Sequence, residues 1–281
     1  MSTSAPSVAG RAAAPFGRRE ARLQDVRSLG AYRLLSALDG SGVLPRAGQF
    51  YMLATSDGWG GETDGRPFLG RACSVARAAA QDGGVRLDFL LEAVGPGTAR
   101  LCAGEPGEAL QIVGPLGVGF RAPAPGRRAL LVGGGVGIAP LAIWQDELRD
   151  ARIAARVLLG FRDERHAHGG GLLHEPRLAT DDGSVGHHGL VTELLADELV
   201  GPAASVVYAC GPPPMLEAVR VICSERGIPA QLALESGMAC GFGACFGCVV
   251  PTRDGYIRLC VDGPVLDATR LETALAPGAG H

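Results

Sequence analysis

The sequence lacks any uninterrupted apolar stretch of the roughly 20 residues that a membrane-spanning helix needs. Its N-terminal part has no apolar core of signal-peptide length, so secretion is not expected. The formal net charge is only −3, which gives no reason to expect a nucleic acid or an anionic membrane as a partner. No internal repeat is visible. These absences predict a soluble, cytoplasmic protein.

The first 17 residues contain no acidic residue, as in an organelle transit peptide, but their Ala, Ser and Pro content favours a disordered tail. The remaining chain is longer than one hydrophobic core usually supports, since the whole sequence has 281 residues. Glycine is abundant, with 43 residues partly in clusters, which indicates loops where backbone approaches a ligand. Several domains with ligand sites are therefore expected.

Residues 18–125 contain short β-branched or alternating apolar stretches that Gly and Pro interrupt, which is typical of a small antiparallel β-barrel. Within them, GPGTARLC predicts a Gly-rich turn that enters a short helix. Pro123, Pro125 and Gly126 suggest a hinge. Residues 126–236 then alternate strands and helices, which predicts a Rossmann-like parallel α/β domain. Residues 237–281 are rich in Gly and Cys and show little periodicity, as expected of a segment that a metal cluster organises.

The most specific motif is MACGFGACFGC followed by a later cysteine. Cys240, Cys245, Cys248 and Cys260 have the spacing C-x4-C-x2-C-x11-C, and the first three match the plant-type 2Fe–2S ligand loop. Zinc commonly takes paired C-x2-C knuckles, of which only one is present, so a 2Fe–2S cluster is favoured over zinc. Disulfides are less favoured still, because the composition is not that of a small secreted scaffold.

Two glycine-containing motifs follow predicted strands of the α/β domain. LLVGGGVGIAPL places Gly134, Gly135 and Gly137 between a strand and a helix, where bare backbone and a helix N-terminus can hold a pyrophosphate. YACGPPPM places Cys210 at the end of another strand, at the sheet edge where ligands bind in such folds. Taken alone, Cys210 is more often a packed core thiol.

The barrel portion carries a second phosphate signal. Arg71 and Ser74 lie three residues apart on a predicted strand, and Gly97 and Thr98 open the predicted short helix. An Arg next to a helix N-terminus suits a diphosphate. An isolated Arg on a barrel surface, by contrast, is usually only solvated.

From about Phe16 to Leu266, the chain resembles the electron-transfer subunits of NAD-dependent (class 1B) dihydroorotate dehydrogenase, in the ferredoxin-reductase superfamily. The resemblance rests on FLGRACSVA, GPGT, GPLGVGF, GGGVGIAPL, ACGPPPML and, most specifically, LESGMACGFGACFGC with CVDGPV. It departs where the family often reads RRP before the flavin-strand Ser, because this chain has Gly70, Arg71 and Ala72. Cys73 also replaces the aliphatic or aromatic residue that usually contacts the flavin.

The resemblance implies FAD, a 2Fe–2S cluster and NAD as cofactors, and a role in pyrimidine (UMP) biosynthesis. It implies a catalytic role for Cys210 beside the flavin–nicotinamide contact, and an FMN-containing dihydroorotate dehydrogenase partner in a heterotetramer of two plus two chains. By this resemblance, the residues that bind FAD are Arg71, Ala72, Cys73, Ser74, Gly97 and Thr98. Electrons would pass from the partner through the cluster and FAD to NAD⁺.

Alternatives remain at three points. The chain could be the NAD(P)H-linked reductase subunit of a hydrogenase, glutamate synthase or oxygenase complex. It could also be a non-catalytic iron–sulfur sensor, although an intact flavin site argues against that. Asp163 could accept from a ribose hydroxyl and favours NAD, whereas Arg162 could serve a 2′-phosphate.

Overall fold

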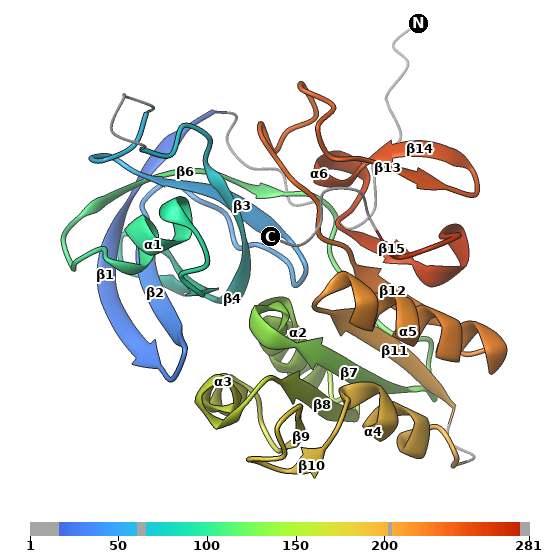
Figure 1. Cartoon of the computed structure of the whole chain (residues 1–281). Coiled ribbons are helices and arrows are strands. Elements are labelled where there is room, and N and C mark those ends of the chain that lie inside the picture. The colour runs from blue at the N-terminus through green and yellow to red at the C-terminus, as the bar shows by residue number, and fades with distance from the viewer. Residues whose placement is uncertain (1–16, 61–65, 202–203, 276–281) are drawn as a thin grey trace, which may run out of the picture.

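The computed structural model describes residues 17–60, 66–201 and 204–275. These residues form a closed barrel, a sheet flanked by helices, and a C-terminal segment that packs against both (Figure 1). The expected fold class, an antiparallel β-barrel with a Rossmann-like α/β domain and a cluster segment, is confirmed. The expected disordered tail lies almost entirely outside the described residues. Within the described ranges, no helix is long and apolar enough to cross a membrane.

The barrel closes in the strand order β1-β2-β5-β4-β3-β6, and every neighbouring pair is antiparallel. A short helix, α1 (Pro96–Cys102), connects β5 to β6 at the position that GPGTARLC predicts. The strands are β1 (Arg19–Leu29), β2 (Tyr32–Asp39), β3 (Phe50–Thr55), β4 (Arg71–Gln81), β5 (Gly84–Leu91) and β6 (Ala109–Leu116). Alternate residues such as Leu87 and Phe89 are fully buried, as the two-residue period of a strand requires.

The second sheet has the order β10-β9-β8-β7-β11-β12-β15 and is parallel except for β15. Its strand order reverses between β7 and β11, which is where open α/β sheets bind ligands. The strands are β7 (Arg128–Gly134), β8 (Ala155–Phe161), β9 (Pro176–Thr180), β10 (His187–His188), β11 (Ser205–Cys210), β12 (Ala230–Ala233) and β15 (Val265–Asp267).

Helices cover both faces of this sheet (Figure 1). α2 (Ala139–Asp150) packs between the sheet and barrel strand β4, while α4 (Val191–Glu198) and α5 (Pro213–Glu225) pack beside each other. Shorter turns are α3 (Glu164–Ala167), η1 (Gly135–Ile138), η2 (His168–Leu172) and η3 (Ala268–Arg270).

The barrel and the α/β domain share a polar and apolar interface. Arg77 of β4 forms an ion pair with Asp146 of α2 and also donates to the carbonyl of Leu172. The backbone N–H of Ala47 donates to Glu147 at 2.9 Å. Because these contacts come from several elements, α2 holds the two domains in a fixed relation.

The C-terminal segment contains a hairpin of β13 (Val249–Thr252) and β14 (Gly255–Arg258), followed by α6 (Leu259–Asp262). It then returns to the parallel sheet, where β15 pairs with β12 in antiparallel orientation. The segment predicted to have little regular structure therefore contributes an edge strand to the seven-stranded sheet. The chain just before the cysteine motif and the chain just after it lie side by side, because Ala233 pairs with Val265.

Candidate functional site

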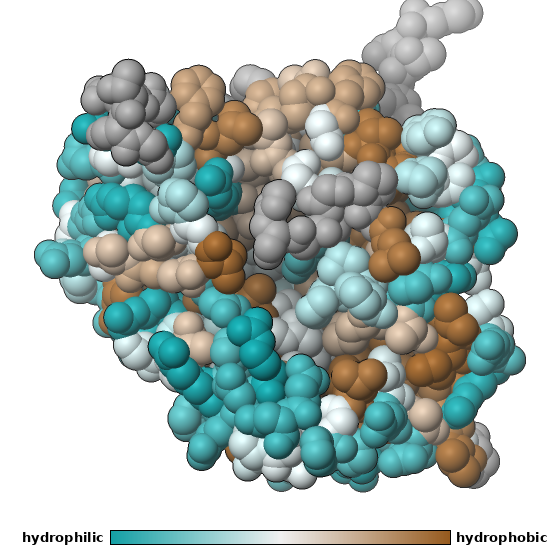
Figure 2. All heavy atoms as spheres, viewed as in Figure 1, coloured by the Kyte–Doolittle hydropathy of each residue, from teal (hydrophilic) through white to brown (hydrophobic). Residues whose placement is uncertain are grey.

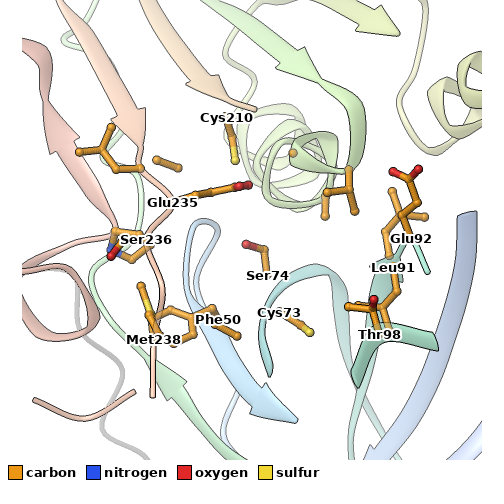
Figure 3. A pocket seen from close by; sticks show the side chains of 18 of the residues that line it. Phe50, Cys73, Ser74, Leu91, Glu92, Thr98, Cys210, Glu235, Ser236 and Met238 are labelled. Atoms are coloured by element: carbon orange, nitrogen blue, oxygen red, sulfur yellow. The ribbon is translucent and has the colours of Figure 1, made fainter. Parts of the chain in front are cut away.

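A cavity lies where the barrel, the carboxyl ends of β7 and β11, and the chain after β12 meet (Figure 3). Its wall combines stretches that are far apart in the sequence. The predicted site residues on this wall are Ala72, Cys73, Ser74, Thr98, Gly137 and Cys210. Those that do not line it are Arg71, Gly97, Gly134, Gly135 and Asp163. The structure thus brings the flavin strand and the Cys210 motif to one cavity.

Arg71 lies directly against the turn that opens α1. A Cβ atom on Gly97 would stand 2.4 Å from Nε of Arg71, so a larger residue at this position would displace the guanidinium from its present place. Arg71 also donates to the carbonyl of Leu69 at 2.6 Å and lies 5.8 Å above the ring of Trp59. The predicted pairing of an Arg with the GPGT turn is therefore present as a spatial contact.

Thr98 has a structural task in the same turn. Its hydroxyl oxygen accepts from the backbone N–H groups of Val94 and Gly95 at 3.0 and 3.1 Å. The hydroxyl also reaches the carbonyl of Gly95 at 3.2 Å. The Thr98 side chain therefore fixes the turn and lines the cavity, so that backbone and Arg71 remain as the groups able to meet a phosphate.

The glycines after β7 serve two purposes. A Cβ on Gly137 would lie 2.6 Å from the backbone of Gly211, and one on Gly134 would lie 2.7 Å from the sulfur of Met215. These two glycines are required because the loops after β7 and β11 touch each other. Gly135 differs: its φ is +54° and a Cβ there would meet no atom closer than 4.0 Å. Of the three, Gly135 offers the most open backbone to a ligand.

Cys210 ends β11 and is almost completely buried. Burial raises the pKa of its thiol well above the ordinary value, and the nearby Glu235 carboxyl raises the pKa further. Cys210 is therefore a neutral thiol at physiological pH, suited to contact an uncharged ring rather than to act as a nucleophile.

Glu235 is a site residue that the motifs did not reveal. It follows β12, and its carboxyl extends into the cavity between Cys210 and Ser74 (Figure 3). Burial by the surrounding walls raises the pKa of this carboxyl above its usual value, although the open cavity leaves its side chain accessible. A charged residue two positions after the buried strand AQLA was a usable signal, because the chain after such strand ends lines the ligand crevice.

Asp163 lies away from the cavity, at the end of β8. It caps α3, where its Oδ1 accepts from the backbone N–H of His166 at 3.0 Å and approaches the ring Nδ1 of the same residue at 2.7 Å. These hydrogen bonds lower the pKa of the Asp163 carboxyl. Arg162 next to it is exposed. Both candidates for coenzyme selection thus lie at the carboxyl end of β8.

The four motif cysteines form two neighbouring pairs. The sulfurs of Cys248 and Cys260 lie 3.2 Å apart in the interior, and the thiol of Cys240 is hydrogen-bonded to Cys245, which is exposed. Burial alone would raise the pKa of Cys240, but N–H groups of Cys245 and Phe242 outweigh it and lower the pKa to about 6. In the described part of the chain, no three ligand-type side chains surround one point as a single metal ion requires. Two thiol pairs suit two irons.

The cysteine segment also contacts the barrel. A Cβ on Gly241 would lie 2.5 Å from Cγ of Met52 in β3, so the ligand loop packs closely on that strand. Two residues before Cys240, Met238 lines the cavity, as does Phe50 of β3 (Figure 3). The chain around the first motif cysteine therefore contacts β3 and also contributes to the cavity wall.

Known proteins resemble this chain over most of its length. The family model for the iron-sulfur cluster binding domain of dihydroorotate dehydrogenase B matches residues 235–272. The dihydroorotate dehydrogenase B (NAD(+)) electron transfer subunit of Caldanaerobacter subterraneus subsp. tengcongensis is 34% identical, over 88% of this chain and 96% of the relative. The subunit of that name from Geobacillus thermodenitrificans is 40% identical, over 72% of this chain and 79% of the relative.

Solved structures share the fold at lower identity. The NADH-dependent reduced ferredoxin-NADP oxidoreductase matches with a TM-score of 0.75 and 24% identity over 92% of each chain. A ferredoxin NADP⁺ reductase from Neisseria gonorrhoeae with bound FAD and NADP has a TM-score of 0.57 and 18% identity, over 75% of this chain and 92% of that one. These structures show the fold, and the sequence relatives show that the chain belongs to the family of dihydroorotate dehydrogenase B electron transfer subunits.

Proposed function

We propose that this chain holds FAD, a 2Fe–2S cluster and a site for NAD, and connects a partner dehydrogenase with NAD⁺ in pyrimidine biosynthesis. The observation that carries the proposal is that the start of the cysteine segment forms part of the cavity wall. Met238 of this segment lines the cavity together with Phe50 of β3. When bound, the cluster carries single electrons and FAD converts them to the hydride that nicotinamide takes. The relatives that share this name support the assignment.

The residues proposed to hold FAD either line the cavity on its barrel side or, like Arg71 and Gly97, lie next to lining residues without lining it themselves. Arg71 and the Gly97 turn would meet the diphosphate, since a charge-assisted bond and open backbone lie together there. Ala72, Cys73 and Ser74 line the cavity and would contact the ring system. Cys73 is small and buried, so it can pack against an apolar ring face.

On the opposite wall, Cys210 and Glu235 would face the place where nicotinamide meets the flavin. The Cys210 thiol stays protonated and so introduces no charge next to the reacting rings. Glu235 holds a proton more readily than an ordinary carboxylate, because burial raises its pKa. We therefore assign Glu235 as the group that carries a proton into or out of the cavity.

The nucleotide part of NAD would lie along the carboxyl ends of β7 and β8. Gly135 offers open backbone to the pyrophosphate. The second carboxylate oxygen of Asp163 is available to a ribose hydroxyl, because the contacts with His166 use Oδ1. This arrangement favours NAD over NADP, as a carboxylate would repel a 2′-phosphate.

The cluster segment is proposed as the surface that meets the catalytic subunit. It exposes Phe242, Phe246 and Tyr256, and aromatic side chains are enriched at the centres of protein interfaces. Arg258 lies 5.1 Å above the Phe246 ring and so supports it in an exposed position. Figure 2 shows hydrophobic residues between the barrel and the β13–β14 hairpin, whereas hydrophilic residues cover the side around α3. By family resemblance the partner is an FMN-containing barrel, in a complex of two plus two chains.

The test is anaerobic co-purification with a dihydroorotate-oxidising subunit, followed by measurement of NAD⁺ reduction. The mixture should couple dihydroorotate to NAD⁺, whereas the isolated chain should only transfer electrons from NADH to artificial acceptors. Cys248→Ser should abolish the coupled reaction. Oxidation of dihydroorotate by the isolated chain would contradict the proposal, as would subunits that bind but never couple.

A further inference from the structure

The short helix α3 is attached to the barrel as well as to its own sheet. The carbonyl of Arg165 accepts from the backbone N–H of Ala31, in the β1–β2 turn, at 3.0 Å. A Cβ on Gly30 would lie 2.0 Å from that carbonyl, so only glycine allows the turn to approach so closely. The capping residue of this helix is Asp163, the proposed ribose acceptor. The nucleotide site is thereby connected to the flavin domain.

His166 of α3 lies between two carboxylates that belong to different domains. Its Nδ1 is 2.7 Å from Oδ1 of Asp163, and its Nε2 is 3.3 Å from Oε1 of Glu92. Glu92 follows β5 and lines the cavity. The His166 side chain is only 12% exposed, so water has limited access to the bridge. The order Glu92–His166–Asp163 therefore runs from the cavity wall to the proposed ribose acceptor.

The protonation state of His166 decides how many of these bonds form. Carboxylates only accept, so both contacts are hydrogen bonds only when both ring nitrogens carry a proton. A neutral ring keeps one donor, and the shorter distance favours Asp163 as its partner. The Nε2 lone pair then faces the Glu92 carboxylate, and that bond is lost. Tyr32 of β2 also faces the ring, edge-on with centroids 5.7 Å apart, and the charge of the neighbouring Arg162 acts on both Asp163 and Tyr32.

We infer that His166 is a positioning residue for the pyridine nucleotide, which joins Asp163 to Glu92 across the domain boundary most firmly when its ring is doubly protonated. The inference rests on the proposed nucleotide site. It predicts that nucleotide affinity falls as the pH rises, because a ring that has lost one proton keeps only one donor for the two carboxylates. The turnover rate, kcat, is not expected to change with pH in the same way as nucleotide affinity, because His166 touches neither the cavity nor the proposed reacting groups.

The experiment measures KM for NADH and kcat with an artificial acceptor, on the FAD-loaded chain between pH 5.5 and 8.5. KM of the unmodified protein should rise about fivefold across this range, the change expected for one hydrogen bond, with kcat unaffected by this equilibrium. His166→Gln should show the high KM at every pH. His168→Gln is the matched control, because His168 is exposed and lies two residues away, and it should behave as the unmodified protein.

Glu92→Gln supplies a readout that a merely structural role would not give. An amide at position 92 can donate to the neutral ring, so KM should stay low and lose its pH dependence. If His166→Gln keeps the KM and pH profile of the unmodified protein while Asp163→Ala raises KM, the inference is wrong and the nucleotide site stands. If Asp163→Ala also leaves KM unchanged, the proposed ribose contact is wrong, and the inference fails with it.

Discussion

The cysteine segment and the cavity proposed to hold FAD are adjacent in space but are built in opposite ways. The four thiols all lie between Cys240 and Cys260 and are arranged by one loop, one hairpin and one helical turn. The cavity wall draws on residues from Phe50 to Pro264, on the barrel, the parallel sheet and the segment after β12. Loss of one thiol should therefore affect cluster binding and little else. FAD binding in the cavity, by contrast, should depend on how the barrel and the α/β domain pack against each other.

The largest expected effect comes from removing one thiol. Cys245→Ser should remove most of the iron and acid-labile sulfide, about two of each per chain in the intact protein, because each iron needs two thiolates. FAD content and reduction of the flavin by NADH should stay nearly unchanged, because Cys245 is exposed and away from the cavity wall. Iron, sulfide and flavin analyses of anaerobically purified protein check this. Stoichiometric zinc in place of iron would contradict the cluster assignment.

Next in size is Arg71→Ala on the cavity side. The loss of a charge-assisted bond to phosphate should weaken FAD binding by about 1.5–3 kcal/mol. Iron content should not change. Arg156→Ala is a matched control, since Arg156 is an exposed arginine on β8. Equal FAD affinity in both variants, measured by fluorescence titration of the apoprotein, would show that Arg71 does not meet the flavin.

A smaller effect is expected at Glu235, and it depends on pH. Burial raises the pKa of this carboxyl in the folded protein above the ordinary 4.5. Protonated Glu235 therefore contributes to stability in the folded protein. This contribution is fully present below about pH 4.5 and is lost as the pH rises through the higher pKa of the folded state. Glu235→Gln, which cannot ionise, should raise Tm of the FAD-free protein at pH 7 and have little effect at pH 4. A Tm difference between Glu235→Gln and the unmodified protein that grows toward low pH would contradict a raised pKa for Glu235.

The smallest effect concerns a contact outside both sites. Glu217 of α5 pairs with Arg220 and accepts from the backbone N–H of Ala274, and the first of these contacts chiefly lowers its pKa to about 2. Its contribution to stability is present above pH 4.5 and is lost as the pH falls toward 2. Glu217→Gln should therefore lower stability at pH 7 by about 1 kcal/mol, with little further effect near pH 2. Iron and FAD contents should not change, and urea unfolding at the two pH values measures the difference.

Five stretches of residues 18–125 predict barrel strands and correspond to β2 to β6: RLLSALDG, QFYMLATS, CSVARAAA, VRLDFLLEAV and ALQIVGP. The strand β1 was missed. In REARLQDVRSL only Ala21 and Leu23 are buried, so apolar alternation is too weak to mark a strand. Part of its anchorage is polar: Arg19 pairs with the fully buried Asp39 of β2 at 2.5 Å. Likewise β15 has three residues and gains its place only by pairing with β12. Tertiary contacts, not local pattern, create these two strands.

The site was predictable to the extent that its chemistry is local. Gly97 and Arg71 were expected to act together, and their contact is visible because each belongs to a recognisable turn or strand. His166 and Glu92 carry no motif, since their relation exists only after two domains meet. The glycines after β7 were interpreted as ligand-facing, and Gly137 does line the cavity, but Gly134 and Gly137 also lie against the chain that follows β11. Sequence spacing cannot separate those two requirements.

The pairing of Ala233 with Val265 gives the cluster segment a closed base. Main-chain hydrogen bonds and burial of Leu266 therefore offset part of the cost in chain entropy of bringing the two flanks of the cysteine motif together. This pairing involves none of the four thiols, which all lie in the chain between Ala233 and Val265.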